Sequence, residues 1–186
     1  MSLSSRREAV RHIRDSIQLA VSCVTDRVVH TQPSRLRLLN ATSETLMVAL
    51  SGGDPTTLVA EEPLLLKVQC LVNVGRRLGD SGSLWSAHIA GYFYELRASA
   101  ADEIASYHLH PSVDDGMSRP HLHIGIGATG AETRSRSGRF HKIHFPTEVI
   151  AVEDVIQLAI VEFGARPRRP DWAAVLDATR RMRANT

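Results

Sequence analysis

Histidine is the residue type whose spacing in this chain suggests chemistry. Six of the nine histidines fall between Tyr107 and His144, and four of these form two His-x-His pairs, His108-Leu109-His110 and His121-Leu122-His123. Alternate side chains of a β-strand point to the same face of a sheet, so each pair projects both imidazoles to one side. If the two strands are antiparallel neighbours, all four rings line one face within mutual reach.

These four histidines are candidate metal ligands. Imidazole is the commonest side-chain ligand of transition metals, and a set of His108, His110, His121 and His123 suits a divalent ion such as Zn, Mn, Ni or Fe. Two carboxylates in the loop between the pairs could add oxygen ligands, Asp114 and Asp115.

Two other interpretations of the histidines stay open. Paired histidines can cleave a phosphodiester without a metal, one acting as base and the other as acid. The catalytic candidates are then His121, His123 and His144, because His141 and His144 follow a loop that could fold back over the same sheet face. The histidines could also be solvent-facing residues on the open side of a half-buried sheet. Their density favours a functional site.

The seven residues from Pro120 to Ile126 resemble the signature of the histidine-triad nucleotide hydrolases and transferases. In that family the central histidine of His-x-His-x-His attacks the α-phosphate of a nucleotide. Gly125 stands where the third histidine of the signature belongs. The sequence is therefore not assigned to that family.

A basic loop between the histidine groups points to phosphate. Residues 128–140 are predicted to form a polar, mobile loop. It contains three arginines separated by glycines and serines, namely Arg134, Arg136 and Arg139. These arginines could bind substrate phosphates or a nucleic-acid backbone. The alternative is an ordinary solvated loop. The sequence contains no Gly-Lys-Ser/Thr phosphate loop and no dinucleotide glycine fingerprint, which argues against a nucleotide cofactor.

Together these features predict a hydrolase of phosphoester bonds in RNA, DNA or a nucleotide that uses a divalent metal. The alternative is a non-catalytic module that binds metal, nucleic acid or a partner protein, such as a toxin–antitoxin or defence-associated partner. Nucleic acid or a nucleotide and a partner protein are thus the candidate partners, and a membrane is not among them.

Composition sets the limits of these interpretations. The chain has 186 residues and 20.5 kDa, the size of one domain, so a single domain over residues 1–186 is expected. Hydrophobic residues make up 43% and charged residues 23%, which excludes wholesale disorder. Two cysteines exclude a disulfide scaffold, and the N-terminus has no uninterrupted apolar run, so a soluble cytoplasmic protein is expected. Of the 22 basic residues 20 are arginine, which we attribute mainly to a GC-rich bacterial genome.

Hydrophobic spacing predicts the elements that hold these residues. Apolar residues at three- and four-residue intervals predict a helix from the capping residue Ser4 or Ser5 to Val28, and a second, shorter helix is expected from Ala41 to Leu50. The N-terminal part, residues 4–50, is thus expected to be helical.

From residue 56 to residue 127 the period changes to two, which predicts an antiparallel meander. Its strands are expected over residues 64–74, 84–97, 103–110 and 121–127, with a connection from Gly75 to Ser83. Leu109, Leu122, Ile124 and Ile126 alternate with the histidines and are expected in the core.

Two helices are predicted over residues 151–184, with Gly164 as the stop of the first and Asp171 as the start of the second. The predicted fold class is therefore α+β: N-terminal helices, an antiparallel sheet of about four strands, and two C-terminal helices packed on one face.

Overall fold

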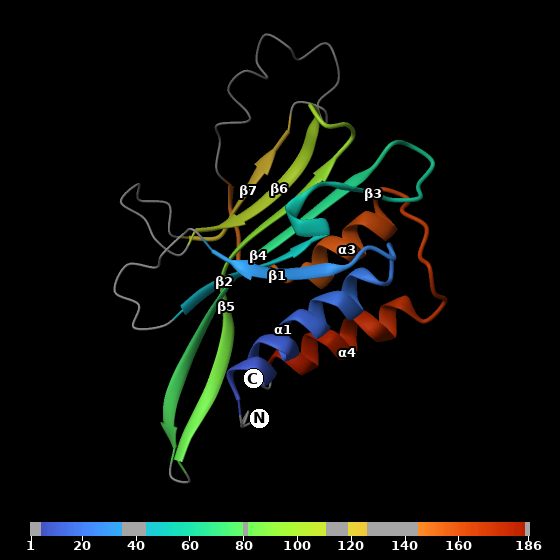
Figure 1. The fold of residues 1–186 in the computed structure, drawn as a ribbon. Coiled ribbons are helices and arrows are strands. Elements are labelled where there is room, and N and C mark those ends of the chain that lie inside the picture. The colour runs from blue at the N-terminus through green and yellow to red at the C-terminus, as the bar shows by residue number, and fades with distance from the viewer. Residues whose placement is uncertain (1–4, 35–43, 80–81, 111–118, 126–144, 185–186) are drawn as a thin grey trace.

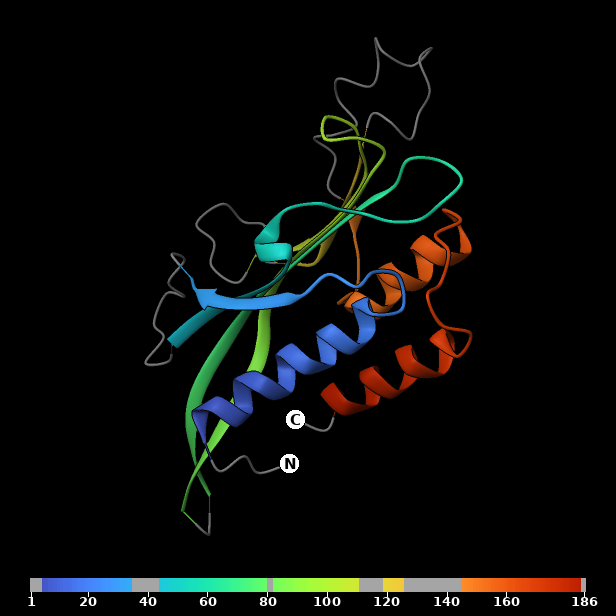
Figure 2. The ribbon, with the colours of Figure 1, turned by 45° about the vertical axis from the view of Figure 1, so that its right-hand side comes forward.

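The computed structural model describes residues 5–34, 44–79, 82–110, 119–125 and 145–184. In this part of the chain an antiparallel sheet is covered on one face by three α-helices, α1, α3 and α4 (Figures 1 and 2). The α+β class is confirmed, and so is the order of an N-terminal helix, a sheet and two C-terminal helices. Among the described residues, no helix combines the length and the apolar composition needed to cross a bilayer.

The described sheet has eight strands, more than the four expected. Their order is β1-β2-β4-β5-β6-β7-β8, with β3 paired to β4 beside this path, and every pairing is antiparallel. From β4 to β7 each strand lies next to the one that follows it in the chain, so the meander is confirmed. The bounds are β1 Val29–Pro33, β2 Glu44–Leu50, β3 Thr56–Thr57, β4 Leu65–Gly79, β5 Gly82–Arg97, β6 Glu103–Leu109, β7 His121–Ile124 and β8 Phe145–Pro146.

The helix predicted from Ala41 to Leu50 is wrong, because residues Glu44–Leu50 form β2. The side chains of Leu46, Val48 and Leu50 are all buried, which is the period of a strand. A short apolar run is compatible with either a helix or a strand. Here the segment pairs with β1 on one side and β4 on the other, and this pairing stabilises the strand. The expectation of a wholly helical N-terminal part is therefore wrong.

The β4–β5 hairpin is longer than the sequence pattern predicts. The connection expected from Gly75 to Ser83 is mostly strand, since β4 continues to Gly79 and β5 begins at Gly82. Arg76 pairs with Trp85 across the two strands, and its guanidinium carbon lies 5.0 Å from the centre of the indole ring. A cation stacked on indole stabilises such a pair, which favours continued pairing where turn residues suggested a loop.

Helix α1, Arg6–Val21, begins as predicted and ends earlier. The Ser5 hydroxyl accepts the N–H of Glu8 while the Glu8 carboxylate accepts the N–H of Ser5, a reciprocal cap. The helix does not reach Val28, which is 56% exposed, because the chain turns after Ser22 to enter β1.

The C-terminal helices follow the predicted pattern closely. They are α3, Val152–Val161, and α4, Trp172–Ala184. Gly164 has a φ of 65°, the left-handed conformation that suits a glycine just after a helix. The Arg183 guanidinium contacts the fully buried Glu153 carboxylate, and this ion pair ties α4 to α3.

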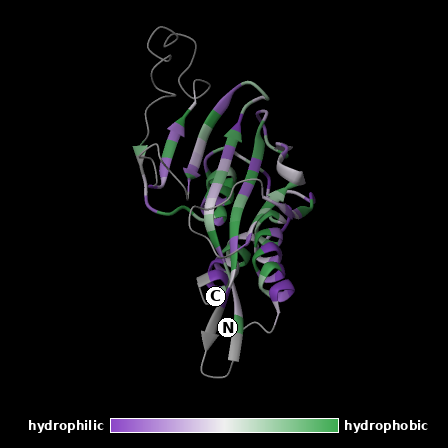
Figure 3. Cartoon of the chain, turned by 60° about the vertical axis from the view of Figure 1, so that its left-hand side comes forward, coloured by the Kyte–Doolittle hydropathy of each residue, from purple (hydrophilic) through white to green (hydrophobic). Residues whose placement is uncertain are grey.

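The core lies between the helices and one face of the sheet. Buried residues of β4 and β5 on this face include Val68, Cys70, Tyr92 and Tyr94. Hydrophobic and hydrophilic residues follow one another along the strands (Figure 3). The polar residues of these strands therefore lie on the opposite face, which the three helices do not cover and which we call the open face.

Ile17 of α1 tests this packing. Its side chain is fully buried, so Ile17→Ala removes core contacts and should lower the free energy of unfolding by about 2–5 kcal/mol. Leu19 on the same helix is 36% exposed, and Leu19→Ala should cost no more than about 0.5 kcal/mol. Urea denaturation followed by circular dichroism measures both, and equal losses would contradict the described orientation of α1.

Candidate metal centre

The two His-x-His pairs lie side by side on the open face. His108 of β6 is directly opposite His121 of β7, and Phe93 of β5 is directly opposite His108 on its other side. Leu109 pairs with the buried Tyr92 and packs against the core on the helix-covered face. The prediction that all four histidines share one sheet face is confirmed.

The four imidazoles are in ring contact, and we call His108, His110, His121 and His123 the histidine cluster. Ring centres lie 4.9 Å apart for His108 and His123, and 5.0 Å apart for His121 and His123. The ring of His108 is 5.7 Å from that of His110 and 5.7 Å from that of His121. The rings of His110 and His121 are also 5.7 Å apart, so His108 and His121 each contact the other three members of the cluster.

Three members of the cluster, His108, His110 and His121, can converge on one ion. Each offers a ring nitrogen, and the three nitrogens lie within 4.8 Å of one another. Tetrahedral zinc with bonds of about 2.1 Å requires nitrogens about 3.4 Å apart. The rings must therefore approach by up to about 1.4 Å, a movement within reach of small side-chain rotations. His123 lies beside this set of three rather than in it.

The hydrogen bond of His121 defines the tautomer of its ring. Its side chain is 3% exposed, and its Nδ1 lies 2.8 Å from the carbonyl oxygen of Arg119. A carbonyl only accepts, so Nδ1 carries the proton and donates it. Nε2 is then the ring nitrogen through which His121 could bind a metal ion. Metal-binding histidines are commonly oriented by such a bond from their other nitrogen.

His108 has a buried nitrogen with nothing to bind. Its Nε2 has no hydrogen-bond partner among the described residues. Burial lowers the pKa of His108 from 6.5 to about 4, and the neighbouring charges of His123, His110 and His121 act in the same direction. The ring is therefore neutral at pH 7. A buried polar atom without a partner is unfavourable, and a bound ion or substrate would satisfy it.

A carboxylate lies behind the cluster on the same face. Glu95 is 8% exposed and accepts hydrogen bonds from Lys67 at 2.9 Å and from Arg97 at 2.8 Å. Burial alone would raise the pKa of Glu95, but these two cations outweigh it and hold the pKa below its usual value. Glu95 is thus a permanent negative charge, and it acts on His108 in the direction that favours a cation.

A cavity of about 440 Å³ adjoins the cluster, and its lining includes His108, His123, Ser106, Arg97 and Asp102. Gly125 forms part of the wall, where an added Cβ would lie 1.6 Å from the backbone oxygen of Glu103. No side chain fits there, so the third histidine of the histidine-triad signature has no place in this fold. A small substrate could reach His108 and His123 from this cavity.

Some predicted site residues are outside the described part of the chain. These are His141, His144, Asp114, Asp115, Arg134, Arg136 and Arg139. Phe93 is an unpredicted member of the site, and its ring centre is 4.9 Å from that of His108 and 4.8 Å from that of His110. Glu95 and Lys67 were not predicted at the site either. The sequence pattern could have identified Phe93 and Glu95, because these residues alternate with the core tyrosines along β5.

Comparison of the chain with protein-family models, with curated proteins and with solved structures finds no match. Function is therefore inferred from the geometry of the histidine cluster.

The low pKa of His108 predicts how stability depends on pH in metal-free protein. Unfolded His108 binds a proton near pH 6.5, whereas the folded residue binds one only near pH 4. Between these values the unfolded state holds more protons, so the free energy of unfolding should fall as pH drops, by at most about 3 kcal/mol. Urea denaturation at several pH values between 7 and 4, in the presence of a chelator, measures this.

His108→Leu should flatten that pH dependence, because it removes the group that titrates. His30→Leu is the matched control, since His30 is an exposed strand histidine of β1. If the His108 variant keeps the slope of the wild type, the ring is not held neutral by its surroundings.

Proposed function

We propose that this protein is a metal-dependent hydrolase of phosphoester bonds, acting on RNA, DNA or a nucleotide. The observation that carries the proposal is the convergence of His108, His110 and His121, whose ring nitrogens lie within 4.8 Å of one another on the open face. The buried Nε2 of His108, which has no hydrogen-bond partner in the described part of the chain, supports it, because such an atom is stabilised by a ligand.

The donor set favours zinc among the candidate ions. All three donors are imidazole, a ligand that suits Zn, Ni and Fe better than the harder Mn. Three protein ligands leave a fourth tetrahedral position open, which distinguishes catalytic from structural zinc sites. An ion held there would lower the pKa of a bound water to about 7 and so supply a nucleophile at neutral pH.

His123 is the candidate proton carrier. It touches the rings of both His108 and His121, lines the adjoining cavity and does not belong to the set of three. From this place it can take a proton from the nucleophile or give one to the leaving group. In a metal-free reaction His121 and His123 would be the acid–base pair, with His144 as a further candidate.

The proposal of a phosphate-binding group is based on the sequence. Arg134, Arg136 and Arg139 are proposed to hold substrate phosphates, because guanidinium groups fork onto phosphate oxygens. Arg97 lines the cavity but is bound to Glu95, so we assign it a supporting role.

One observation favours a second candidate, a non-catalytic metal-binding module. Strand β7 has only four residues, and His121 of β7 faces His108 of β6. An ion shared by these strands would fasten β7 to the sheet, as structural metals do. Such a module would display the open face to nucleic acid or to a partner protein.

Metal content tests the ligand set. Protein prepared without a histidine tag should hold about one equivalent of a divalent transition metal, measured by elemental analysis after gel filtration. His110→Ala and His121→Ala should each lose the ion, whereas His123→Ala and the control His88→Ala should keep it. Far-ultraviolet circular dichroism should remain near wild type in all four. Equal metal content in every variant would exclude the proposed ligands.

Turnover distinguishes the enzyme from the module. Metal-loaded protein should cleave a phosphodiester from a panel of bis(p-nitrophenyl) phosphate, short RNA and short DNA, and a chelator should abolish cleavage. His123→Ala should lower kcat by about 10²–10⁴-fold with the metal retained, the usual effect of losing a general acid or base. A loaded protein that cleaves none of these substrates would favour the module instead.

A further inference from the structure

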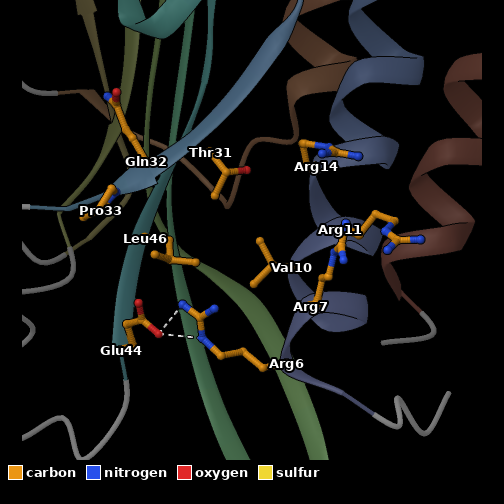
Figure 4. Close-up of a pocket in the computed structure, with 10 residues that line it drawn as sticks. All are labelled: Arg6, Arg7, Val10, Arg11, Arg14, Thr31, Gln32, Pro33, Glu44 and Leu46. Carbon is orange, nitrogen blue, oxygen red and sulfur yellow. Dashed lines mark hydrogen bonds and ion pairs between the residues drawn. The ribbon is translucent and has the colours of Figure 1, made fainter.

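A second candidate site lies on the helix-covered side of the sheet, at the edge formed by β1 and β2. A cavity of about 760 Å³ separates α1 from these two strands (Figure 4). Four arginines of α1 line it, namely Arg6, Arg7, Arg11 and Arg14. We call it the arginine cavity. The histidine cluster is on the opposite face of the sheet and on other strands.

Positive charge in the arginine cavity is only partly neutralised. Arg6 extends from α1 to the Glu44 carboxylate of β2, as the dashed lines in Figure 4 show. Arg14 pairs with its neighbour Asp15 at 2.9 Å. The exposed side chains of Arg7 and Arg11 have neither a hydrogen bond nor an ion pair within the described ranges 5–34, 44–79, 82–110, 119–125 and 145–184. Among the described residues that line the cavity, Glu44 is the one that is acidic.

Two electrostatic effects disfavour the charges of Arg7 and Arg11. Arg7 lies in the first turns of α1, where the partial positive charge of the helix end repels a cation. Arg7 and Arg11 are four residues apart on one helix face, and like charges at that spacing repel each other. The carboxylate of Glu44, the acidic group of the described lining, is already bound to Arg6, so a bound anion would relieve both repulsions at once.

The rest of the lining is suited to more than a simple anion. Val10 of α1 and Leu46 of β2 point towards each other in Figure 4 and give the cavity an apolar floor. Thr31 and Gln32 of β1 add hydrogen-bonding groups. The volume lies within the range of small-molecule sites, which combine apolar walls with a few polar groups. The guanidinium groups could bind a phosphate, and the apolar floor beside them could contact a nucleotide base joined to that phosphate.

We propose that the arginine cavity binds the phosphates of a nucleotide unit, either a free nucleotide or part of a single strand. Arg7 and Arg11 supply the unpaired charge, and the floor of Val10 and Leu46 accommodates the base. Glu44 restrains the site, because it holds Arg6. The proposal does not depend on metal in the histidine cluster.

Two probes and two pairs of variants test the arginine cavity in metal-free, chelator-treated protein, so that the histidine cluster adds no metal-dependent binding. The probes are ATP, measured by calorimetry, and a fluorescein-labelled twelve-nucleotide uridine RNA, measured by anisotropy. Arg7→Gln/Arg11→Gln is compared with Arg166→Gln/Arg168→Gln, which removes the same charge from two exposed arginines near the opposite end of α1. Glu44→Gln is compared with Glu162→Gln, an exposed glutamate just after α3.

Expected results differ in sign between the variants. Arg7→Gln/Arg11→Gln should weaken binding at least tenfold, and for RNA it should reduce the slope of log K against log salt by about 1.4, the contribution of two phosphates on a single strand. Glu44→Gln should strengthen binding, because it releases Arg6. Both controls should stay within about twofold of wild type. Binding of ATP alone would identify a free nucleotide, and binding of RNA alone a strand.

Two results would overturn the proposal. One is that neither probe binds wild-type protein. The other is that each variant changes affinity as much as its control, which would mean that net charge rather than this cavity attracts the probe. Loss of the melting transition in Arg7→Gln/Arg11→Gln is not expected, since both side chains are exposed and their mutual repulsion is removed.

Discussion

The pairing of β6 with β7 is the interaction on which the histidine cluster depends. With His108 opposite His121, both His-x-His pairs face the open side, and the leucine of the first pair packs against the core. A slip of one residue would turn Leu122 outward and carry His121 and His123 to the helix-covered face. The same side-chain alternation continues from β5 into β6, where Leu109 pairs with Tyr92, and the hydrogen bond of the buried His121 to the carbonyl of Arg119 orients its ring within β7.

The two faces of the sheet differ in polarity. Helices α1, α3 and α4 cover one face and bury the apolar half of every long strand, so the polar half gathers on the other. On this open face Glu95 lies two residues from Phe93 on β5, with Lys67 and Arg97 bound to it. Three imidazoles whose ring nitrogens lie within 4.8 Å of one another make an environment for a cation, whereas the charge of Glu95 is already offset by Lys67 and Arg97. At the far edge of the sheet, the guanidinium groups of Arg7 and Arg11, which have no ion pair among the described residues, make an environment for an anion.

Local patterns identified much of this fold. The apolar stripes of α3 and α4, the capped start of α1 at Ser5 and the stop at Gly164 are properties of short segments, and each is found where the sequence places it. The error at Glu44–Leu50 has the same origin, since a short apolar run carries no information about whether neighbouring strands will pair with it.

For the candidate sites too, local features follow from the sequence and long-range features do not. The sequence alone determined that His108 and His110 share one side of a strand, and that His121 and His123 do so too, because side-chain alternation is a local property of the extended backbone. The predicted meander already implied that these two strands are neighbours, which the pairing of β6 with β7 confirms, but only the tertiary structure decided that three of the four rings converge and that Glu95 lies on the same face. It also decided that Glu44 neutralises Arg6 and leaves Arg7 and Arg11 exposed and unpaired in the described chain. These features depend on pairings between residues distant in the chain, which the register and the packing of the whole sheet establish.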